Sequence, residues 1–142
     1  MIYLDTSCLI KLLREEPESN RVRLAVDNEQ IVIVSSLVEL ETEIQLKASA
    51  LGGIIRPGQW RHYQIRLTAL RNLDPFHFRH LPGSVFVAAL RQHQRPRAGY
   101  CRTVDRLHLA AIEELGLSRL MTLDRQQARV ATDLGFQVLY PG

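Results

Sequence analysis

The chain of 142 residues lacks the features that mark several large classes of protein. No apolar run approaches the ~20 residues that cross a bilayer, so the sequence predicts no membrane-spanning segment. The first residues, MIYLD, do not form a basic leader followed by an apolar stretch, and we therefore expect no secretory signal. The length fits a single domain, residues 1–142, and leaves no room for a second full core.

Cysteine and histidine patterns that bind metals or form disulfides are also missing. The two cysteines, Cys8 and Cys101, are too few for a disulfide framework, and neither belongs to a CxxC pair. This usage favours a reducing, cytoplasmic environment. None of the five histidines stands in an HExxH spacing or beside a cysteine, which argues against a zinc site.

Lysine is scarce, and arginine takes its place. Of the 18 basic residues only Lys11 and Lys47 are lysine, and ten arginines lie between residues 52 and 106. Residues 1–51 and 107–142 each carry more acidic than basic side chains. Because the guanidinium group binds phosphate through two parallel hydrogen bonds, the basic segment favours a polyanionic partner. The charge alone is equally compatible with a solvated face or with a surface that docks an acidic protein.

Short apolar runs predict the strands of the fold, and helical patterns lie between them. The run IVIV is continuously apolar and β-branched, as expected for a strand that is buried on both faces. Strands that alternate with helices indicate an α/β fold, with three α/β/α layers and a mostly parallel central sheet of four to five strands. The predicted strands are Ile2–Leu4, Ile31–Val34, Arg119–Leu123 and Gln137–Tyr140.

Glycine and proline divide the rest of the chain. Gly116 and Gly135 are expected to end the helices over about 107–115 and 125–134. Between residues 52 and 97 the breakers Gly52-Gly53, Pro57-Gly58, Pro75 and Pro82-Gly83 separate two helical patterns, at 59–73 and 84–94. We therefore predict a basic helical insertion at about 52–97 within the single domain.

Two aspartates directly follow predicted strands. Asp5 comes after Ile-Tyr-Leu, and Asp124 comes after Leu-Met-Thr-Leu. In an open parallel sheet the ligand crevice lies outside the carboxyl ends of the strands, so both side chains are expected at the same edge. An aspartate between strand and helix commonly caps the helix, and that alternative stays open for each of them.

A third acid comes from the helix that follows IVIV, where Glu39, Glu41 and Glu43 compete. Glu43 and Lys47 have the spacing of a surface ion pair, which predicts a solvated face for Glu39 and Glu43. Glu41 lies beside the apolar stripe and faces the sheet, where an unpaired charge is costly. A metal ion or an arginine of the basic segment is expected to meet it, although Glu39 or Glu43 remains an alternative second acid.

The fourth acid, Asp105, opens a later helix. With Thr103 as the N-cap, Asp105 falls in the first turn, where a negative charge favours the helix dipole. His108 shares its helix face, and we expect a hydrogen-bonded packing role for this histidine rather than a ligand role.

Taken together, the four acids Asp5, Glu41, Asp105 and Asp124 predict a metal site. Clustered carboxylates repel one another unless a cation neutralises them, and an all-oxygen site suits Mg²⁺ or Mn²⁺. The hydroxyls of Thr6, Ser7 and Thr122 are candidates to orient a metal-bound water, with helix capping as the alternative for Ser7.

Four blocks of the sequence resemble the PIN-domain family, and in particular the VapC-type toxins of type II toxin–antitoxin systems. They begin at Asp5 (DTSCLIK), Ser35 (SSLVELE), Asp105 (DRLHLAA) and Thr122 (TLDR). The resemblance implies a metal-dependent ribonuclease that cuts single-stranded RNA, forms a homodimer and is inhibited by a small antitoxin protein. Residues 52–97 match none of the blocks.

The predicted function is therefore a metal-dependent endoribonuclease, with the metal held by the four acids and the phosphodiester backbone bound by arginines. The non-enzymatic alternative is an RNA-binding or partner-binding module that has kept the acids without activity. A receiver-type phosphorylation switch is less favoured, because it needs a well-placed lysine and only Lys11 and Lys47 exist.

Overall fold

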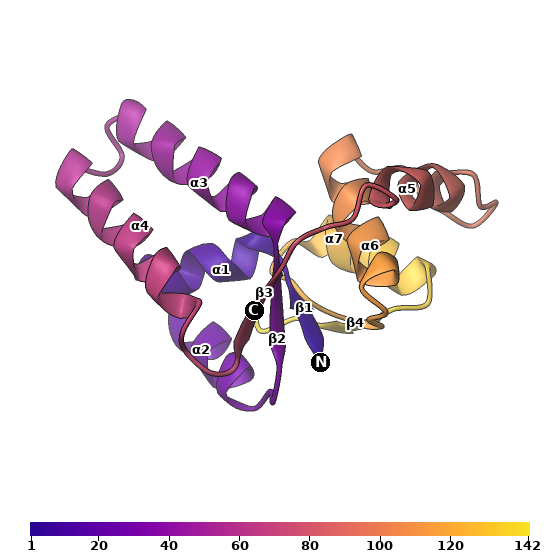
Figure 1. Cartoon of the computed structure of the whole chain (residues 1–142), viewed down its shortest axis with the longest axis horizontal. Coiled ribbons are helices and arrows are strands. Elements are labelled where there is room, and N and C mark those ends of the chain that lie inside the picture. The colour runs from indigo at the N-terminus through magenta and orange to yellow at the C-terminus, as the bar shows by residue number, and fades with distance from the viewer.

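Five parallel strands form the central sheet, which lies between two layers of helices (Figure 1). The computed structural model describes residues 1–142. The strands stand in the order β3-β2-β1-β4-β5, and every pairing is parallel. The predicted three-layer α/β/α fold is confirmed, and the sheet is wholly rather than mostly parallel. The strands are β1 (Ile2–Leu4), β2 (Val32–Ser35), β3 (Phe76–Arg79), β4 (Arg119–Met121) and β5 (Gln137–Leu139).

Which face of the sheet a helix covers depends on the side of β1 to which the next strand is added. After β1 the chain adds β2 and β3 on one side, and later β4 and β5 on the other, so right-handed crossovers place the early and late helices on opposite faces. Figure 1 shows these two layers. One holds α1 (Thr6–Leu13), α2 (Ser19–Asp27), α3 (Ser36–Leu51) and α4 (Pro57–Leu70), and the other holds α5 (Val85–His93), α6 (Thr103–Glu114) and α7 (Arg125–Asp133).

The core is centred on the two innermost early strands. All residues of β1 and β2 are buried, which confirms that Val32 to Val34 of the IVIV run belong to a strand covered on both faces, whereas Ile31 lies just before the strand and is half-buried. Leu9 and Val38 pack on the sheet from one layer, and Leu109 and Ile112 belong to the same core cluster from the other. This buried centre fixes the carboxyl ends of β1 and β4 side by side, because these two strands are hydrogen-bonded neighbours.

Two glycines end helices as predicted. Gly116 follows α6 with φ of 69°, and Gly135 follows α7 with φ of 90°, in the left-handed region that a Cβ disfavours. The amide of Leu117 then donates to the carbonyl of Ile112, which closes the end of α6.

Two elements were not predicted from the sequence, α2 and β3. The strand β3 lies within the segment 52–97, pairs with β2 and forms one edge of the sheet. The segment therefore supplies an edge strand in addition to the helices α4 and α5, and its standing as an insertion stays a prediction.

No helix in the chain is both long and apolar enough to cross a membrane. Cys8 and Cys101 are both free thiols, in agreement with the absence of a disulfide framework.

Candidate active site

Asp5 lies at the carboxyl end of β1 and is held by two hydroxyl groups. Its side chain is buried, and Oδ2 accepts hydrogen bonds from Ser7 Oγ at 2.8 Å and from Thr122 Oγ1 at 2.7 Å. Although Asp5 occupies the N-cap position of α1, its side chain makes no capping hydrogen bond. The capping alternative therefore does not account for this aspartate.

Ser7 and Thr122 join the turns that follow β1 and β4. The amide of Leu123 donates to Ser7 Oγ at 2.9 Å, and the amide of Asp124 donates to Thr122 Oγ1 at 3.0 Å. Each hydroxyl thus accepts a hydrogen bond from a backbone amide of the turn after β4 and donates one to the Asp5 carboxylate. The structure places both side chains as supports of Asp5, whereas Thr6 Oγ1 is buried without a hydrogen-bond partner.

Glu41 on α3 is half-buried and faces His108 of α6. His108 is buried, and its Nε2 lies 3.0 Å from Glu41 Oε1. Burial is the largest single influence and would raise the pKa of Glu41, but His108, the Thr6 hydroxyl and the charge of Arg102 together lower the pKa below its ordinary value. In this structure the direct partner of Glu41 is a histidine and not an arginine, and a role for Glu41 beside a metal ion stays a prediction.

A chain of buried polar groups continues behind His108. Its Nδ1 lies 2.8 Å from the hydroxyl of Tyr3, which lies 2.7 Å from Ser35 Oγ. An ionised Glu41 can only accept, so His108 Nε2 donates to it and Nδ1 accepts from Tyr3, which in turn accepts from Ser35. The predicted packing role of His108 is confirmed, and it extends to the orientation of Glu41.

The other two glutamates of α3 turn away from this edge. Glu39 pairs with Arg71, and Glu43 accepts a hydrogen bond from Gln64 at 3.1 Å, both on α4 or at its end. The expected Glu43–Lys47 ion pair is not formed, because α4 packs along α3 and supplies closer partners. Of the three acids, Glu41 alone points to the candidate site.

Asp105 lies in the first turn of α6, as predicted, and pairs with Arg102, which occupies the N-cap position in place of Thr103. Arg102 Nε lies 3.2 Å from Asp105 Oδ2. The pKa of Arg102 is raised, first by the hydrogen bond to Asp105 and then also by the charges of Asp124 and Glu41. Arg102 therefore pairs with Asp105 and also interacts with the charges of two further acids.

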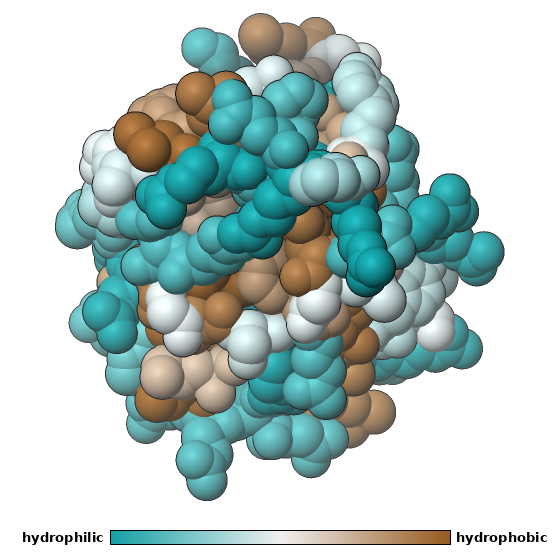
Figure 2. Space-filling model, turned by 90° about the vertical axis from the view of Figure 1, so that its right-hand side faces the viewer, coloured by the Kyte–Doolittle hydropathy of each residue, from teal (hydrophilic) through white to brown (hydrophobic).

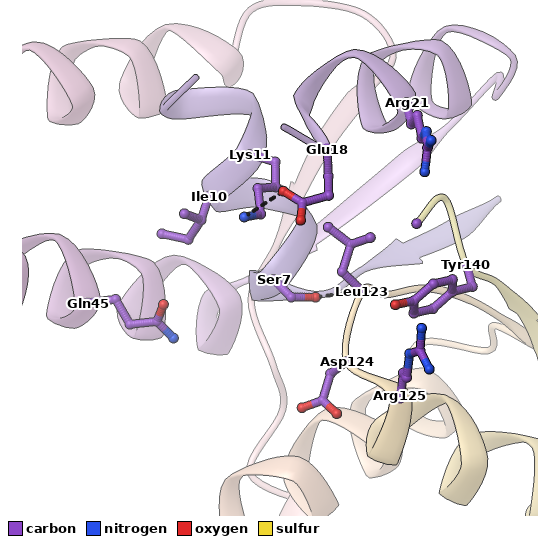
Figure 3. Close-up of a pocket in the computed structure, with 11 residues that line it drawn as sticks. Ser7, Ile10, Lys11, Glu18, Arg21, Gln45, Leu123, Asp124, Arg125 and Tyr140 are labelled. Atoms are coloured by element: carbon purple, nitrogen blue, oxygen red, sulfur yellow. Dashed lines mark hydrogen bonds and ion pairs between the residues drawn. The ribbon is translucent and has the colours of Figure 1, made fainter. Parts of the chain in front are cut away.

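Asp124 caps α7, as the capping alternative predicts. Its Oδ1 accepts from the amides of Gln126 and Gln127 at 2.9 and 3.1 Å. The other oxygen accepts no hydrogen bond, and Figure 3 shows the carboxylate directed into the space below Ser7. Capping and a ligand role can therefore use different oxygens of the same side chain.

One feature of this edge favours binding of a divalent cation, and another does not. The four carboxylates gather at one edge, and Asp5, Asp105 and Asp124 each keep an oxygen that accepts no hydrogen bond. However, no three Asp, Glu, His or Cys side chains lie close enough to share a metal ion. Each acid has its own partner within the chain instead: hydroxyl groups for Asp5, His108 for Glu41, Arg102 for Asp105 and the first amides of α7 for Asp124. The donor set is the all-oxygen kind that Mg²⁺ prefers.

Comparison with known proteins identifies the family. The family model described as PIN domain matches residues 2–133. This chain belongs to the PIN domain family. Ribonuclease VapC46 of Mycobacterium tuberculosis is 30% identical over 145 residues, and the match covers 99% of this chain and 97% of the relative.

Solved PIN-domain structures share the fold at low sequence identity. Mycobacterium tuberculosis VapC20, described as a Sarcin-Ricin loop cleaving toxin, has a TM-score of 0.69 at 20% identity and covers 96% of each chain. FitAB bound to an IR36 DNA fragment has a TM-score of 0.74 at 17% identity, with 99% of this chain and 95% of that chain covered. These likenesses confirm the predicted fold.

Sequence reasoning missed two residues of the site, Tyr3 and Arg102. Tyr3 is hidden within an apolar strand, and only its buried hydroxyl shows that it belongs to the polar chain behind Glu41. Arg102 stands three residues before Asp105, a spacing that could have indicated the ion pair.

Proposed function

We propose that this PIN domain is a Mg²⁺- or Mn²⁺-dependent endoribonuclease that hydrolyses RNA phosphodiester bonds. The observation that carries the proposal is that β1, α3, α6 and the β4–α7 turn bring four acids to the same edge of the sheet, where three of them (Glu41, Asp105 and Asp124) act on the charge of Arg102. A cation bound at this edge would offset the repulsion among the four carboxylates. The proposal is supported by the family and by the ribonuclease name of the relative VapC46.

The four acids Asp5, Glu41, Asp105 and Asp124 would hold the metal. When bound, a hard dication supplies an activated water and stabilises the charge that develops on the phosphate. Asp5 is held ready by Ser7 and Thr122, so its free oxygen needs little reorganisation. His108 holds Glu41 in the same way from the other layer.

Arg102 is the residue of this edge best placed to bind the substrate backbone. Its side chain is 77% exposed, beyond the acids that attract it. When a metal neutralises those acids, the attraction that holds Arg102 on Asp105 weakens, and the guanidinium can bind an RNA phosphate instead.

We also infer that the chain is the toxin of a toxin–antitoxin pair, with a small antitoxin as partner and a homodimer as its assembly. The inference is supported by the VapC relatives and by the description of VapC20 as a toxin. Hydrophobic residues (brown) are visible between hydrophilic ones (teal) on the face shown in Figure 2. Phe86 and Leu90 of α5 are exposed and, together with Tyr100 and Leu107, line an apolar hollow that suits a protein contact.

The test is cleavage of a labelled single-stranded RNA with and without divalent metal. We expect cutting in Mg²⁺ or Mn²⁺, none in EDTA, and recovery when metal is restored. Asp5→Asn and Asp105→Asn should each reduce the rate ~100-fold or more, because each removes a charged ligand. Glu39→Gln, an equal change on the outer side of α3, should leave it unchanged.

Activity that survives EDTA or persists in Asp5→Asn would defeat the metal mechanism. RNA that is bound but never cut in either metal would instead favour the non-catalytic binding module.

A further inference from the structure

A cavity of about 640 Å³ opens beside the candidate metal site, on the side of β5. Ser7 and Asp124 line it, so one wall is shared with the site described above. Figure 3 shows that the other walls come from α1, α2, α3, the start of α7 and the chain after β5. Its volume falls within the ~300–1,000 Å³ of ordinary ligand pockets.

Two of the three basic side chains that line this cavity form no ion pair. Lys11 forms ion pairs with Glu16 and Glu18, so its charge is already neutralised. Arg21 of α2 and Arg125 of α7 are exposed and form no ion pair with an acid. Two guanidinium groups therefore face the cavity without forming an ion pair, while the two acids of the lining, Glu18 and Asp124, are held by Lys11 and by the first amides of α7. This arrangement suits an anionic ligand.

An aromatic ring completes the cavity. Tyr140 follows β5, and the residue is 39% exposed. Arg125 lies over it, with the guanidinium carbon 6.0 Å from the ring centre (Figure 3). A positive groove that also presents an aromatic face is the combination that binds single-stranded nucleic acid, because bases stack on the ring while cations contact the phosphates.

Polar side chains that can contact a base edge also line the cavity. Gln45 of α3 is exposed there and carries both a donor and an acceptor. Single-stranded RNA is recognised through stacked, unpaired bases whose edges accept and donate hydrogen bonds.

We propose that this cavity, lined by Arg21, Arg125 and Tyr140, binds one nucleotide of the RNA strand next to the bond that is cut. The base stacks on Tyr140, and its phosphate lies between the two arginines. The proposal rests on the ribonuclease function proposed above, because Asp124 and Ser7 join the cavity to that site.

The first experiment measures binding of a short labelled single-stranded RNA by fluorescence anisotropy, with EDTA present so that the strand stays intact. Tyr140→Ala should raise Kd about tenfold or more, whereas Tyr140→Phe keeps the ring and should bind as wild type does. Arg125→Ala should also weaken binding. Arg129→Ala, one turn further along α7 and outside the cavity, is the charge-matched control and should have no effect.

A second experiment locates the stacked base. Each nucleotide of the RNA is replaced in turn by an abasic residue, and Kd is measured for wild type and for Tyr140→Ala. One abasic position should weaken binding to wild type and have no effect on Tyr140→Ala, because the same contact is already lost. Equal losses in both proteins at every position would overturn the proposal, and thermal unfolding of each variant shows that the comparison is between folded proteins.

The two proposals fail in different ways. If wild type cuts RNA and Tyr140→Ala binds and cuts equally well, the nucleotide cavity is wrong and the nuclease stands. If binding depends on Tyr140 but no RNA is cut in Mg²⁺ or Mn²⁺, the cavity stands and the nuclease is wrong.

Discussion

The hydroxyl of Tyr3 is a single atom on which the buried polar chain between β1, β2 and α6 depends. It lies 2.7 Å from Ser35 Oγ and 2.8 Å from His108 Nδ1, and the whole residue is buried. Tyr3→Phe removes this oxygen and keeps the ring. Ser35 then has no acceptor for its hydroxyl proton, and His108 Nδ1 has no donor.

The expected cost follows from these two lost hydrogen bonds. Each is worth roughly 0.5–1.5 kcal/mol net, so the free energy of unfolding should fall by about 1–3 kcal/mol. For a chain of this size that corresponds to a Tm lower by roughly 3–10 °C. Cleavage should also slow, because His108 no longer has a fixed orientation from which to hold Glu41.

Denaturant unfolding followed by circular dichroism measures the difference. Tyr100→Phe is the matched control, since Tyr100 is 79% exposed and its hydroxyl makes no hydrogen bond within the chain. If Tyr3→Phe unfolds within about 0.5 kcal/mol of wild type, as an unimportant surface change would, the polar chain does not carry the role assigned to it.

Three further predictions concern other parts of the molecule. Arg119 donates two hydrogen bonds to Glu29 at 2.7 Å and lowers its pKa, so this pair stabilises the fold above pH 4.5 and the contribution is lost as the pH falls through the folded-state pKa. Glu29→Gln should therefore lower the free energy of unfolding at pH 7, and its difference from wild type should become smaller below pH 4.5, as measured by denaturant unfolding over a pH series. A difference that stays constant with pH would contradict this. Arg102→Ala should reduce the slope of log Kd against log salt for single-stranded RNA by about 0.7, the loss of one phosphate contact, and an unchanged slope would remove Arg102 from the interface. Leu90→Asp, which places a charge on the exposed face of α5, should convert a dimer to a monomer in light scattering, and a persistent dimer would place the interface elsewhere.

The strands could be predicted from the sequence where burial on both faces requires a continuous run of apolar residues. Val32 to Val34 are apolar because both faces of β2 are covered, and that continuous pattern identifies the strand. The strand β3 is different, because it lies at the edge of the sheet and alternates exposed His77 and Arg79 with half-buried phenylalanines. Four residues after a proline, with no buried run, give too weak a pattern to separate from the surrounding loop.

Of the candidate site, only the acidic residues could be predicted from the sequence. Asp5 and Asp124 could be placed together because the carboxyl ends of parallel strands share one edge. Which partner each acid takes could not be read from the chain, since Glu41 and His108 are 67 residues apart in sequence and meet only when both helix layers pack on the sheet. The cavity beside Tyr140 was missed for the same reason, because its walls come from five separate segments.

The turns that follow β1 and β4 support each other although they lie far apart in the sequence. Ser7 bonds to the amide of Leu123, and Asp5 depends on the hydroxyl of Thr122, so the first turn of the protein is completed by residues that are synthesised near the end. A nascent chain on the ribosome, already carrying Asp5, Glu41 and Asp105, still has an unassembled site until β4 is released and docks. A chain that ends before Thr122 therefore lacks the hydroxyl and the amide that hold Asp5 and Ser7 in place.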